Sequence, residues 1–262
     1  MNNAEKRMVE QLKELREVYG AHYVKTEFEG EGISIEDFFR QKDITARAQI
    51  PLAVKIGGGE AITDLKLTKL VGVNKVIGPM LESAFAVEKY VEAVHKVYTE
   101  DELSDLSVGI NIETITAYRN YDDITSSSVF GEIDSVAIGR KDLTFSMGLT
   151  RKNMDGDAVN KVVDGILLMT NKANPKCCGI VGGLGGGLSS IERLKSFGGL
   201  LGGYETRKLI FDVSALDYKP LEGMKKALQF ELLYYTNKAE KYNYASHEDD
   251  AYILRLQNKL EQ

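Results

Sequence analysis

The chain has 262 residues, of which 43% are hydrophobic and 27% charged, and its formal net charge is −6. This composition is typical of a globular protein and excludes a disordered or fibrous chain. No apolar run approaches the length of about 18 residues that a membrane span needs, and the mixed charges create no field that would attract nucleic acid. The N-terminus is charged and amphipathic, unlike a secretory signal, and the two cysteines are adjacent, so we expect a protein of the reducing cytoplasm.

Helical and strand-like patterns alternate along the chain. In chain order they predict a helix at 3–18, a strand at 22–29, a helix at 33–46, a strand at 50–56, a helix at 60–71, a strand at 74–80, a helix at 83–98, a strand at 107–114, a short helix at 118–124, a strand with its exit loop at 134–143, a helix at 158–172, a strand at 177–184, a helix at 190–197, a strand at 207–214, and helices at 219–242 and 247–260. Strands and helices that alternate in this way form parallel βα units.

Seven predicted strands are one fewer than a closed (β/α)8 barrel requires. We therefore expect an α/β fold, a TIM (β/α)8-type barrel in which one N-terminal strand is missing or altered, with a C-terminal helical extension. No linker is evident, so residues 1–262 are expected to form one domain, and the helices at 219–262 are a candidate oligomerisation element. The competing fold is an open doubly wound sheet. Its first turn would be EFEGEG, in which the carboxylates would repel a pyrophosphate.

Three predicted strands carry polar residues on one of their two faces. The residues that share these faces are Lys25, Glu27 and Glu29, then Ala53 and Lys55, then Gly109, Asn111 and Glu113. Barrel strands bury both faces, and buried charges are costly unless they are paired or bound to metal. The charges fall at the carboxyl ends of the strands, where barrel enzymes place their chemistry. The alternative is a structural ion-pair network, for example between Lys25 and Glu27.

Glu113 and Asp142 end consecutive strands, so neighbouring strands would bring their carboxylates together. Two carboxylates completed by water and substrate oxygens describe a Mg²⁺ or Mn²⁺ site. No histidine lies near them, which argues against zinc. Either acid alone has a simpler explanation as an acidic residue at a helix N-terminus.

Two glycine-rich stretches, at 56–61 and 179–187, follow predicted strands. Their backbone N–H groups are candidates for holding a carboxylate or phosphate, or the glycines serve only to allow tight turns. Neither stretch is a P-loop, because no Lys-Ser/Thr pair follows. No basic groove suited to the phosphates of CoA is evident in the sequence.

Four segments resemble the HpcH/HpaI aldolase and citrate lyase β-subunit superfamily over about residues 20–150: VKIGG (54–58), VIGPMLESAFAVEKYVEAV (76–94), INIET (110–114) and IDSVAIGRKDLTFSMG (133–148). The resemblance implies a phosphoenolpyruvate/pyruvate-type barrel with a divalent metal, Mg²⁺ or else Mn²⁺ or Co²⁺, on Glu113 and Asp142. It implies a pyruvate-like 2-oxo acid or a CoA thioester as substrate, with the substrate carboxylate on backbone N–H groups around Arg140 to Asp142. It also implies a homo-oligomer, a trimer or hexamer, in which a C-terminal helix exchanges between subunits.

The resemblance is not complete at the strand ends. The aldolase branch has an arginine where this chain has Lys55, and an Asp-x-Glu-His run where this chain has residues 27–30. The histidine that serves as base in that branch is therefore absent. The strand that usually precedes the N-terminal helix is also missing.

These features together predict a metal-dependent carbon–carbon lyase or aldolase that acts on a 2-oxo acid through an enolate. Lys55 would add positive charge beside the reacting oxygen, and Glu29 is the candidate general base, with Glu31 and Glu60 as alternates. The residues expected to contact the substrate are Glu60, Gly139, Arg140 and Lys141. Two alternatives stay open. Lys55 would form a Schiff base without a metal, or the barrel would bind a carboxylate without turning it over.

Overall fold

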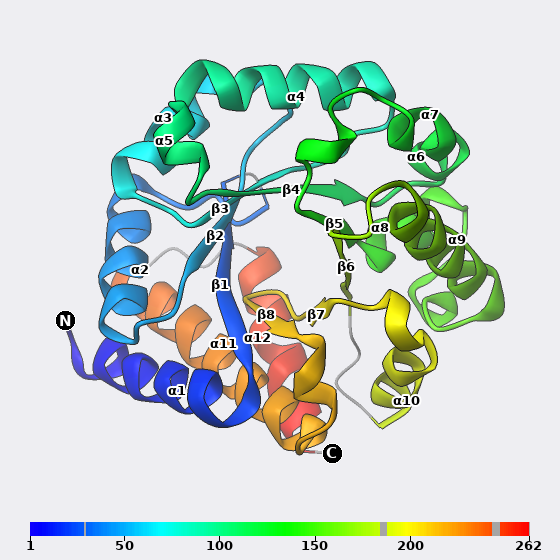
Figure 1. Cartoon of the computed structure of the whole chain (residues 1–262). Helices are drawn as coiled ribbons and strands as arrows, with labels where there is room; N and C mark the ends of the chain where they lie inside the picture. Colours follow the sequence, from blue (N-terminus) through cyan, green and yellow to red (C-terminus); the bar gives the residue numbers. More distant parts are fainter. Residues whose placement is uncertain (29, 184–187, 243–246, 262) are drawn as a thin grey trace.

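The computed structural model describes residues 1–28, 30–183, 188–242 and 247–261. Within them a closed barrel of strands forms in the order β1 to β8, surrounded by helices (Figure 1). The strands are β1 (Ala21–Glu27), β2 (Leu52–Lys55), β3 (Lys75–Gly78), β4 (Ser107–Ile112), β5 (Ser135–Ile138), β6 (Cys178–Val181), β7 (Gly203–Glu205) and β8 (Leu209–Asp212). The helices are α1 (Asn3–Tyr19), α2 (Ile35–Arg47), α3 (Ile62–Val71), α4 (Ala84–Val97), α5 (Glu100–Leu103), α6 (Ile115–Arg119), α7 (Tyr121–Thr125), α8 (Arg140–Ser146), α9 (Asp157–Ala173), α10 (Leu188–Ser196), α11 (Pro220–Tyr242) and α12 (His247–Leu260).

The expected TIM-type barrel is confirmed, and the count of seven strands is corrected to eight. The uncounted strand is β7, which is only three residues long and lies in a glycine-rich segment without a strand pattern. No strand precedes α1 in the described residues, as expected. The position beside β1 is taken by β8, which runs antiparallel to both β1 and β7, whereas β1 to β7 are parallel to one another.

Local sequence signals set the ends of several helices. Ser34 caps α2 by accepting a hydrogen bond from the backbone N–H of Asp37 at 3.1 Å. Gly20 ends α1 in the left-handed region at φ 70°, which costs glycine little and turns the chain directly into β1. The ends of these two helices therefore follow from local sequence signals.

Strand alternation divides the core into two parts. Apolar side chains of one parity, such as Ile110 and Ile112, pack outward into the large cluster shared with the helices. The inward parity forms a separate small apolar cluster of Ala53, Ile77, Ala137, Ile180 and Ile210. Lys55 lies two residues after Ala53, and Gly139 two residues after Ala137, so both are on the inward face of their strands. The polar part of the barrel interior therefore begins directly beyond this small apolar cluster.

The two C-terminal helices pack against each other, and α11 also packs against α1 (Figure 1). Tyr252 of α12 donates a hydrogen bond to Glu231 of α11 at 2.5 Å, and both residues are buried. This contact holds α12 against the rest of the barrel. Among the described residues no helix combines the length and apolar character that crossing a membrane demands.

Candidate active site

A cavity of about 280 Å³ opens at the carboxyl ends of the strands. Glu27 of β1, Lys55 of β2, Glu113 after β4 and Asp142 of α8 all line it. Residues of η2 (Arg151–Asn153), of the β7–β8 turn and of α12 complete its wall. The two acids that the sequence singled out thus share one cavity at the end of the barrel where such enzymes place their chemistry.

Glu113 is almost fully buried, with 3% of its surface exposed. Its carboxylate accepts hydrogen bonds from Asn111 Nδ2 at 3.2 Å and from the Met80 backbone N–H at 3.3 Å. Burial raises the pKa of Glu113, and the nearby Asp142 carboxylate raises it further, against the opposing effect of Lys55. A carboxylate that is buried beside a second acid, with only neutral donors bonded to it, is destabilised in its charged form.

Lys55 forms an ion pair with Glu27, at 2.9 Å between Nζ and Oε2. Burial would raise the pKa of Glu27, but Lys55 and Lys25 outweigh it and lower that pKa to about 2. Burial would lower the pKa of Lys55, but Glu27 and Glu113 outweigh it and leave that pKa raised. Both groups therefore carry full charge at neutral pH.

Lys25 pairs with Glu205 of β7, at 2.5 Å between Nζ and Oε1, rather than with Glu27 as the structural alternative supposed. The second oxygen of Glu205, Oε2, is buried and has no hydrogen-bond partner among the described residues. Glu205 lies next to the cavity from a strand that the sequence did not predict. A network of alternating charges thus connects β1, β2 and β7.

Two residues expected in the site have side chains that are engaged elsewhere. Arg140 is buried, and its guanidinium is held by Asp155 at 2.8 Å and by the carbonyls of Gly182 and Gly183, so only its backbone can face a ligand. The predicted role of its backbone N–H in holding the substrate carboxylate stays a prediction. Glu31, an alternate base, is buried in an ion pair with Lys208 and does not line the cavity.

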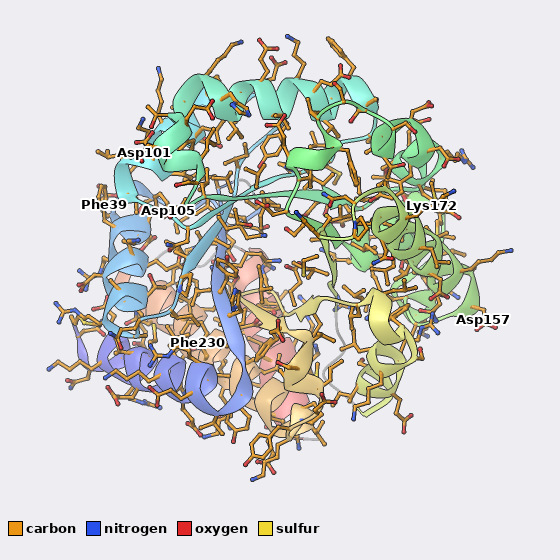
Figure 2. All side chains as sticks on the ribbon, viewed as in Figure 1. Phe39, Asp101, Asp105, Asp157, Lys172 and Phe230 are labelled. Atoms are coloured by element: carbon orange, nitrogen blue, oxygen red, sulfur yellow. The ribbon has the colours of Figure 1, made fainter. Side chains whose placement is uncertain are left out.

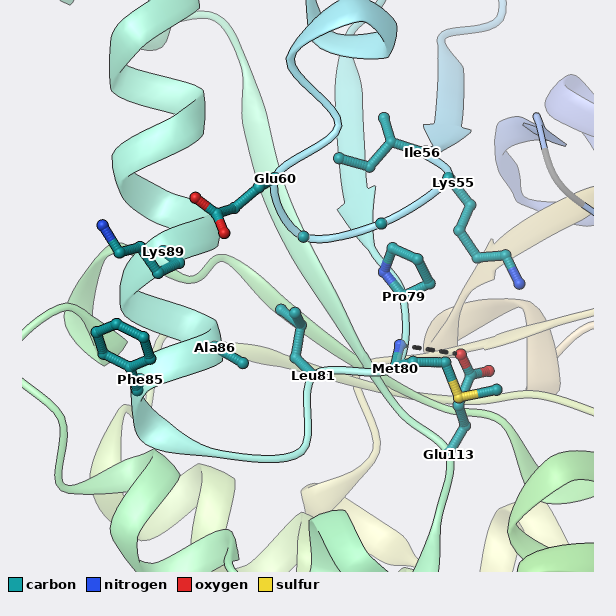
Figure 3. A pocket seen from close by; sticks show the side chains of 13 residues that line it. Lys55, Ile56, Glu60, Pro79, Met80, Leu81, Phe85, Ala86, Lys89 and Glu113 are labelled. Carbon is teal, nitrogen blue, oxygen red and sulfur yellow. Dashed lines mark hydrogen bonds between the residues drawn. The ribbon is translucent and has the colours of Figure 1, made fainter.

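The remaining expected residues divide between two neighbouring cavities. Gly139 and Lys141 line the main one. Glu60 lines a groove of about 530 Å³ beside it, which shares Lys55 and Glu113 with the main cavity. In Figure 3 the Lys55 and Glu113 side chains lie together on one side of this groove, and Phe85 and Lys89 lie on the other. Glu29, the candidate base, lies outside the described residues.

The cavity offers only a few oxygen donors for a hard divalent cation among the described residues. In the described ranges no group of three or more His, Cys, Asp or Glu side chains is arranged to hold a metal. Glu113 and Asp142 supply two carboxylates on an open cavity, a donor set that suits Mg²⁺ because that ion usually keeps several waters. The charge of Asp142 also raises the pKa of the buried Glu113, an effect that a bound cation would offset.

Sequence reasoning did not identify the basic residues that α12 and its neighbours bring to the cavity. They are Arg151, Arg207, Arg255 and Lys259, which line it together with Tyr252. Arg207 follows β7, and its guanidinium lies over the rings of Tyr235 and Tyr252, at 5.5 and 4.9 Å from their centroids. The spacing of residues 252, 255 and 259 on one helical face was the available signal, but nothing local shows which surface that face meets.

The chain matches the family model "HpcH/HpaI aldolase/citrate lyase" over residues 10–182. That range includes both carboxylates and Lys55. No curated protein matches the chain significantly. The family comprises carbon–carbon lyases of the aldolase and citrate lyase type, and its members generally use a divalent metal such as Mg²⁺.

Solved structures support the same fold at low sequence identity. The HpcH/HpaI aldolase from Desulfitobacterium hafniense DCB-2 has a TM-score of 0.61 and 13% identity, covering 86% of this chain and 88% of its own. An HpcH/HpaI aldolase/citrate lyase family protein from Burkholderia cenocepacia J2315 has a TM-score of 0.60 and 14% identity, covering 87% and 98%. The citrate synthase SbnG has a TM-score of 0.58 and 17% identity, covering 76% and 81%. By its sequence match over residues 10–182 and its barrel fold, the chain belongs to the HpcH/HpaI aldolase/citrate lyase family.

Proposed function

We propose that this protein is a divalent-metal-dependent carbon–carbon lyase or aldolase that acts on a pyruvate-like 2-oxo acid through an enolate. One observation carries the proposal: Glu113 and Asp142 line the same cavity at the carboxyl ends of the strands, with the charged Lys55 beside Glu113. The family membership supports the reaction class.

Glu113 and Asp142 would hold the metal, Mg²⁺ or else Mn²⁺ or Co²⁺. When bound, such an ion supplies a Lewis acid that stabilises negative charge developing on the substrate carbonyl oxygen. Gly139 has no side chain, which lets the Glu113 carboxylate lie against the start of α8. The acid therefore stays in the cavity without displacing the helix that carries Asp142.

The substrate carboxylate would be held by the chain itself. The first N–H groups of α8, at Arg140, Lys141 and Asp142, have no partner within the helix and face the cavity end of the barrel. Lys55 stays protonated, because its pKa is raised, and would place a full positive charge near the reacting oxygen. It is itself held in position by Glu27.

The general base must accept a proton near neutral pH, and Glu27 is unsuited to this because its pKa is lowered to about 2. Glu31 is engaged by Lys208 away from the cavity. Glu29 stays our proposed base. The raised pKa of Lys55 also argues against the Schiff-base alternative, because that nucleophile must be neutral to attack a carbonyl.

The test is the exchange of pyruvate methyl protons for deuterium, followed by proton NMR with Mg²⁺, Mn²⁺ or Co²⁺. We expect metal-dependent exchange in the wild type and none above background in Glu113→Ala and Asp142→Ala. Asp157→Ala is the matched control, because Asp157 also lies in the first turn of a helix but stands at the outer surface (Figure 2). Wild-type protein that binds pyruvate without exchange would favour the non-catalytic carboxylate-binding alternative. No exchange and no binding would remove the 2-oxo acid from the proposal.

We also propose a cytoplasmic homo-oligomer, a trimer or hexamer, with residues 219–262 as the contact element. Light scattering of the eluted protein, before and after deletion of the α12 residues, would measure the subunit number. A monomer for the full chain would contradict this part alone and would leave the chemistry untouched.

A further inference from the structure

A groove beside the proposed metal site is larger than the main cavity. Its volume is about 530 Å³, against about 280 Å³ for the main cavity, and the two share Lys55 and Glu113. Small-molecule sites typically have volumes of about 300–1,000 Å³. A ligand in the groove would therefore reach the proposed reacting groups with one of its ends, and the 2-oxo acid does not account for the rest of the groove.

Three segments build the groove: the β2–α3 loop, the β3–α4 loop and the first turns of α4. In Figure 3 Leu81 lies between Lys55 at one end of the groove and Phe85 at the other. Most of the side chains that line it are apolar, and these are Ile56, Pro79, Met80, Leu81, Phe85 and Ala86. The groove thus runs from charged groups at the barrel mouth to an aromatic ring on α4.

Two large apolar side chains of the groove lie in water in the free protein. Phe85 is 66% exposed and Met80 is 52% exposed. Removing apolar surface from water is favourable in proportion to its area, and a ring also makes favourable contacts with another ring and with a thioether sulfur. An apolar ligand would bury surface that the chain alone leaves exposed.

The backbone fixes this lining and joins it to the metal site. Met80 has a φ of 51°, a left-handed conformation that residues other than glycine rarely adopt. Its N–H donates a hydrogen bond to Glu113 Oε1 at 3.3 Å (Figure 3). In the β2–α3 loop, Gly59 packs so closely that an added Cβ would stand 3.0 Å from Leu81 Cδ2. Met80 therefore contacts the proposed metal ligand with its backbone while it lines the groove.

The charges of the groove favour a neutral ligand. Its ionisable lining residues are two lysines and two glutamates, whose formal charges cancel. Lys89, at the Phe85 end, donates a hydrogen bond to Glu92 at 2.7 Å. The Gly57 N–H belongs to the glycine-rich stretch that is a candidate for holding an anion, but it donates to Asp64 Oδ2 at 2.7 Å. An uncharged apolar body matches this lining better than a carboxylate or a phosphate does.

We propose that this groove binds the apolar body of the second reactant, a neutral aromatic or long aliphatic aldehyde. Its carbonyl group would lie near Lys55 and Glu113, and its ring or chain would lie against Met80, Leu81 and Phe85. In the joining direction the enolate carbon of the 2-oxo acid forms a bond to the aldehyde carbon, and the aldehyde oxygen takes up a proton. The inference rests on the proposed function for this reaction, but the binding of an apolar body can be measured without it.

Saturation-transfer NMR titration of the full chain, without metal or 2-oxo acid, tests the groove directly. The probe is cinnamyl alcohol, which has the apolar body of an aromatic aldehyde but cannot form an imine, and glycerol is its polar counterpart. We expect saturable binding of cinnamyl alcohol and none of glycerol. Phe85→Ala should weaken the binding about tenfold because apolar contact area is lost, and Phe85→Leu should recover most of it.

Met80→Gly separates binding from stability. Glycine adopts a positive φ at little cost, so this variant should melt as the wild type does and yet bind cinnamyl alcohol several-fold more weakly. Phe39→Ala is the matched control, because Phe39 is another exposed phenylalanine but lies on α2, outside this groove (Figure 2). It should bind cinnamyl alcohol as the wild type does.

Three results would overturn the inference: no binding of cinnamyl alcohol, equal binding of glycerol, or unchanged binding in Phe85→Ala. Light scattering tests the other possible occupant, a second copy of this chain. Phe85→Asp should leave the subunit number unchanged, and a lower number would overturn the inference because a neighbouring subunit would then fill the groove. The titration contains neither metal nor pyruvate, so its failure is distinct from failure of the exchange test for the proposed function.

Discussion

Glu113 lies directly against Gly139, so closely that a Cβ atom on residue 139 would stand 2.6 Å from Glu113 Oε2 and 2.7 Å from Glu113 Cβ. The two residues follow neighbouring strands, β4 and β5, whose register pairs Ile112 with Ile138. The carboxylate keeps its place only because residue 139 has no side chain. Position 139 therefore controls the geometry of the proposed metal site without touching the metal.

Gly139→Ala should displace the Glu113 carboxylate and weaken metal binding by about tenfold, since overpacking typically costs about 1–3 kcal/mol. Manganese binding, followed by electron paramagnetic resonance, measures the affinity. Gly131→Ala is the control, because a Cβ there meets nothing within 4 Å. Unchanged manganese affinity in Gly139→Ala would show that Glu113 does not hold the metal from its present position.

Glu113→Gln should stabilise the metal-free protein against heat at pH 7–8, by a few degrees in Tm. Burial and Asp142 raise the pKa of Glu113 in the folded state, so its charged form opposes folding above that pKa. The penalty disappears as the pH falls below the unfolded value of 4.5, and there the two proteins should melt alike.

Metal should reverse this order. Saturating Mg²⁺ raises the stability of a protein that binds it, by about 2.7 kcal/mol at one hundred times Kd, and it should raise the Tm of the wild type but not that of Glu113→Gln. Differential scanning fluorimetry with and without Mg²⁺ gives both comparisons. A metal-free variant that is less stable than the wild type at pH 8 would contradict the assigned pKa direction.

The sequence was sufficient for the features that depend on local pattern and strand order. Because consecutive parallel strands are neighbours in the barrel, the spacing of strands was enough to bring Glu113 and Asp142 to one cavity. It missed β7, since three residues cannot show an alternating pattern. It also could not show how the Arg140 side chain is held, because the partners of that side chain, Asp155 and the carbonyls of Gly182 and Gly183, come from later segments.

The sequence could not show that Arg255 and Lys259 of α12 line the cavity, for the same physical reason. The contact that orients α12 joins Tyr252 to Glu231, and the hydrogen bond forms only once two helices have packed. Helical periodicity gives the face on which Arg255 and Lys259 lie, but the packing partner of that face is a long-range property of the fold.

Lys55→Met should lower the rate of pyruvate proton exchange by about a hundredfold or more, because it removes a charge placed beside the developing negative oxygen. Lys55→Arg should recover much of the rate, since the charge and the pairing with Glu27 are kept. Exchange kinetics at saturating metal measure both. Borohydride treatment with pyruvate should leave the wild type unmodified, and a pyruvyl adduct on Lys55 would instead establish the Schiff-base mechanism.

Acid should destabilise the protein partly through Glu27. The folded-state pKa of Glu27 is lowered from 4.5 to about 2, so its ion pair with Lys55 contributes stability that is complete above 4.5 and is lost as the pH falls through the folded value. Glu27→Gln should therefore be less stable than the wild type at pH 6, and the difference should shrink steadily between pH 4.5 and 2. Urea unfolding at each pH measures this difference in stability.

Glu10→Gln, which alters an exposed pair with Lys13, is the control and should show little difference at any pH, because exposed pairs contribute about 0–1 kcal/mol. A Glu27→Gln difference that does not change with pH would mean that the stabilisation comes from packing and not from the charge.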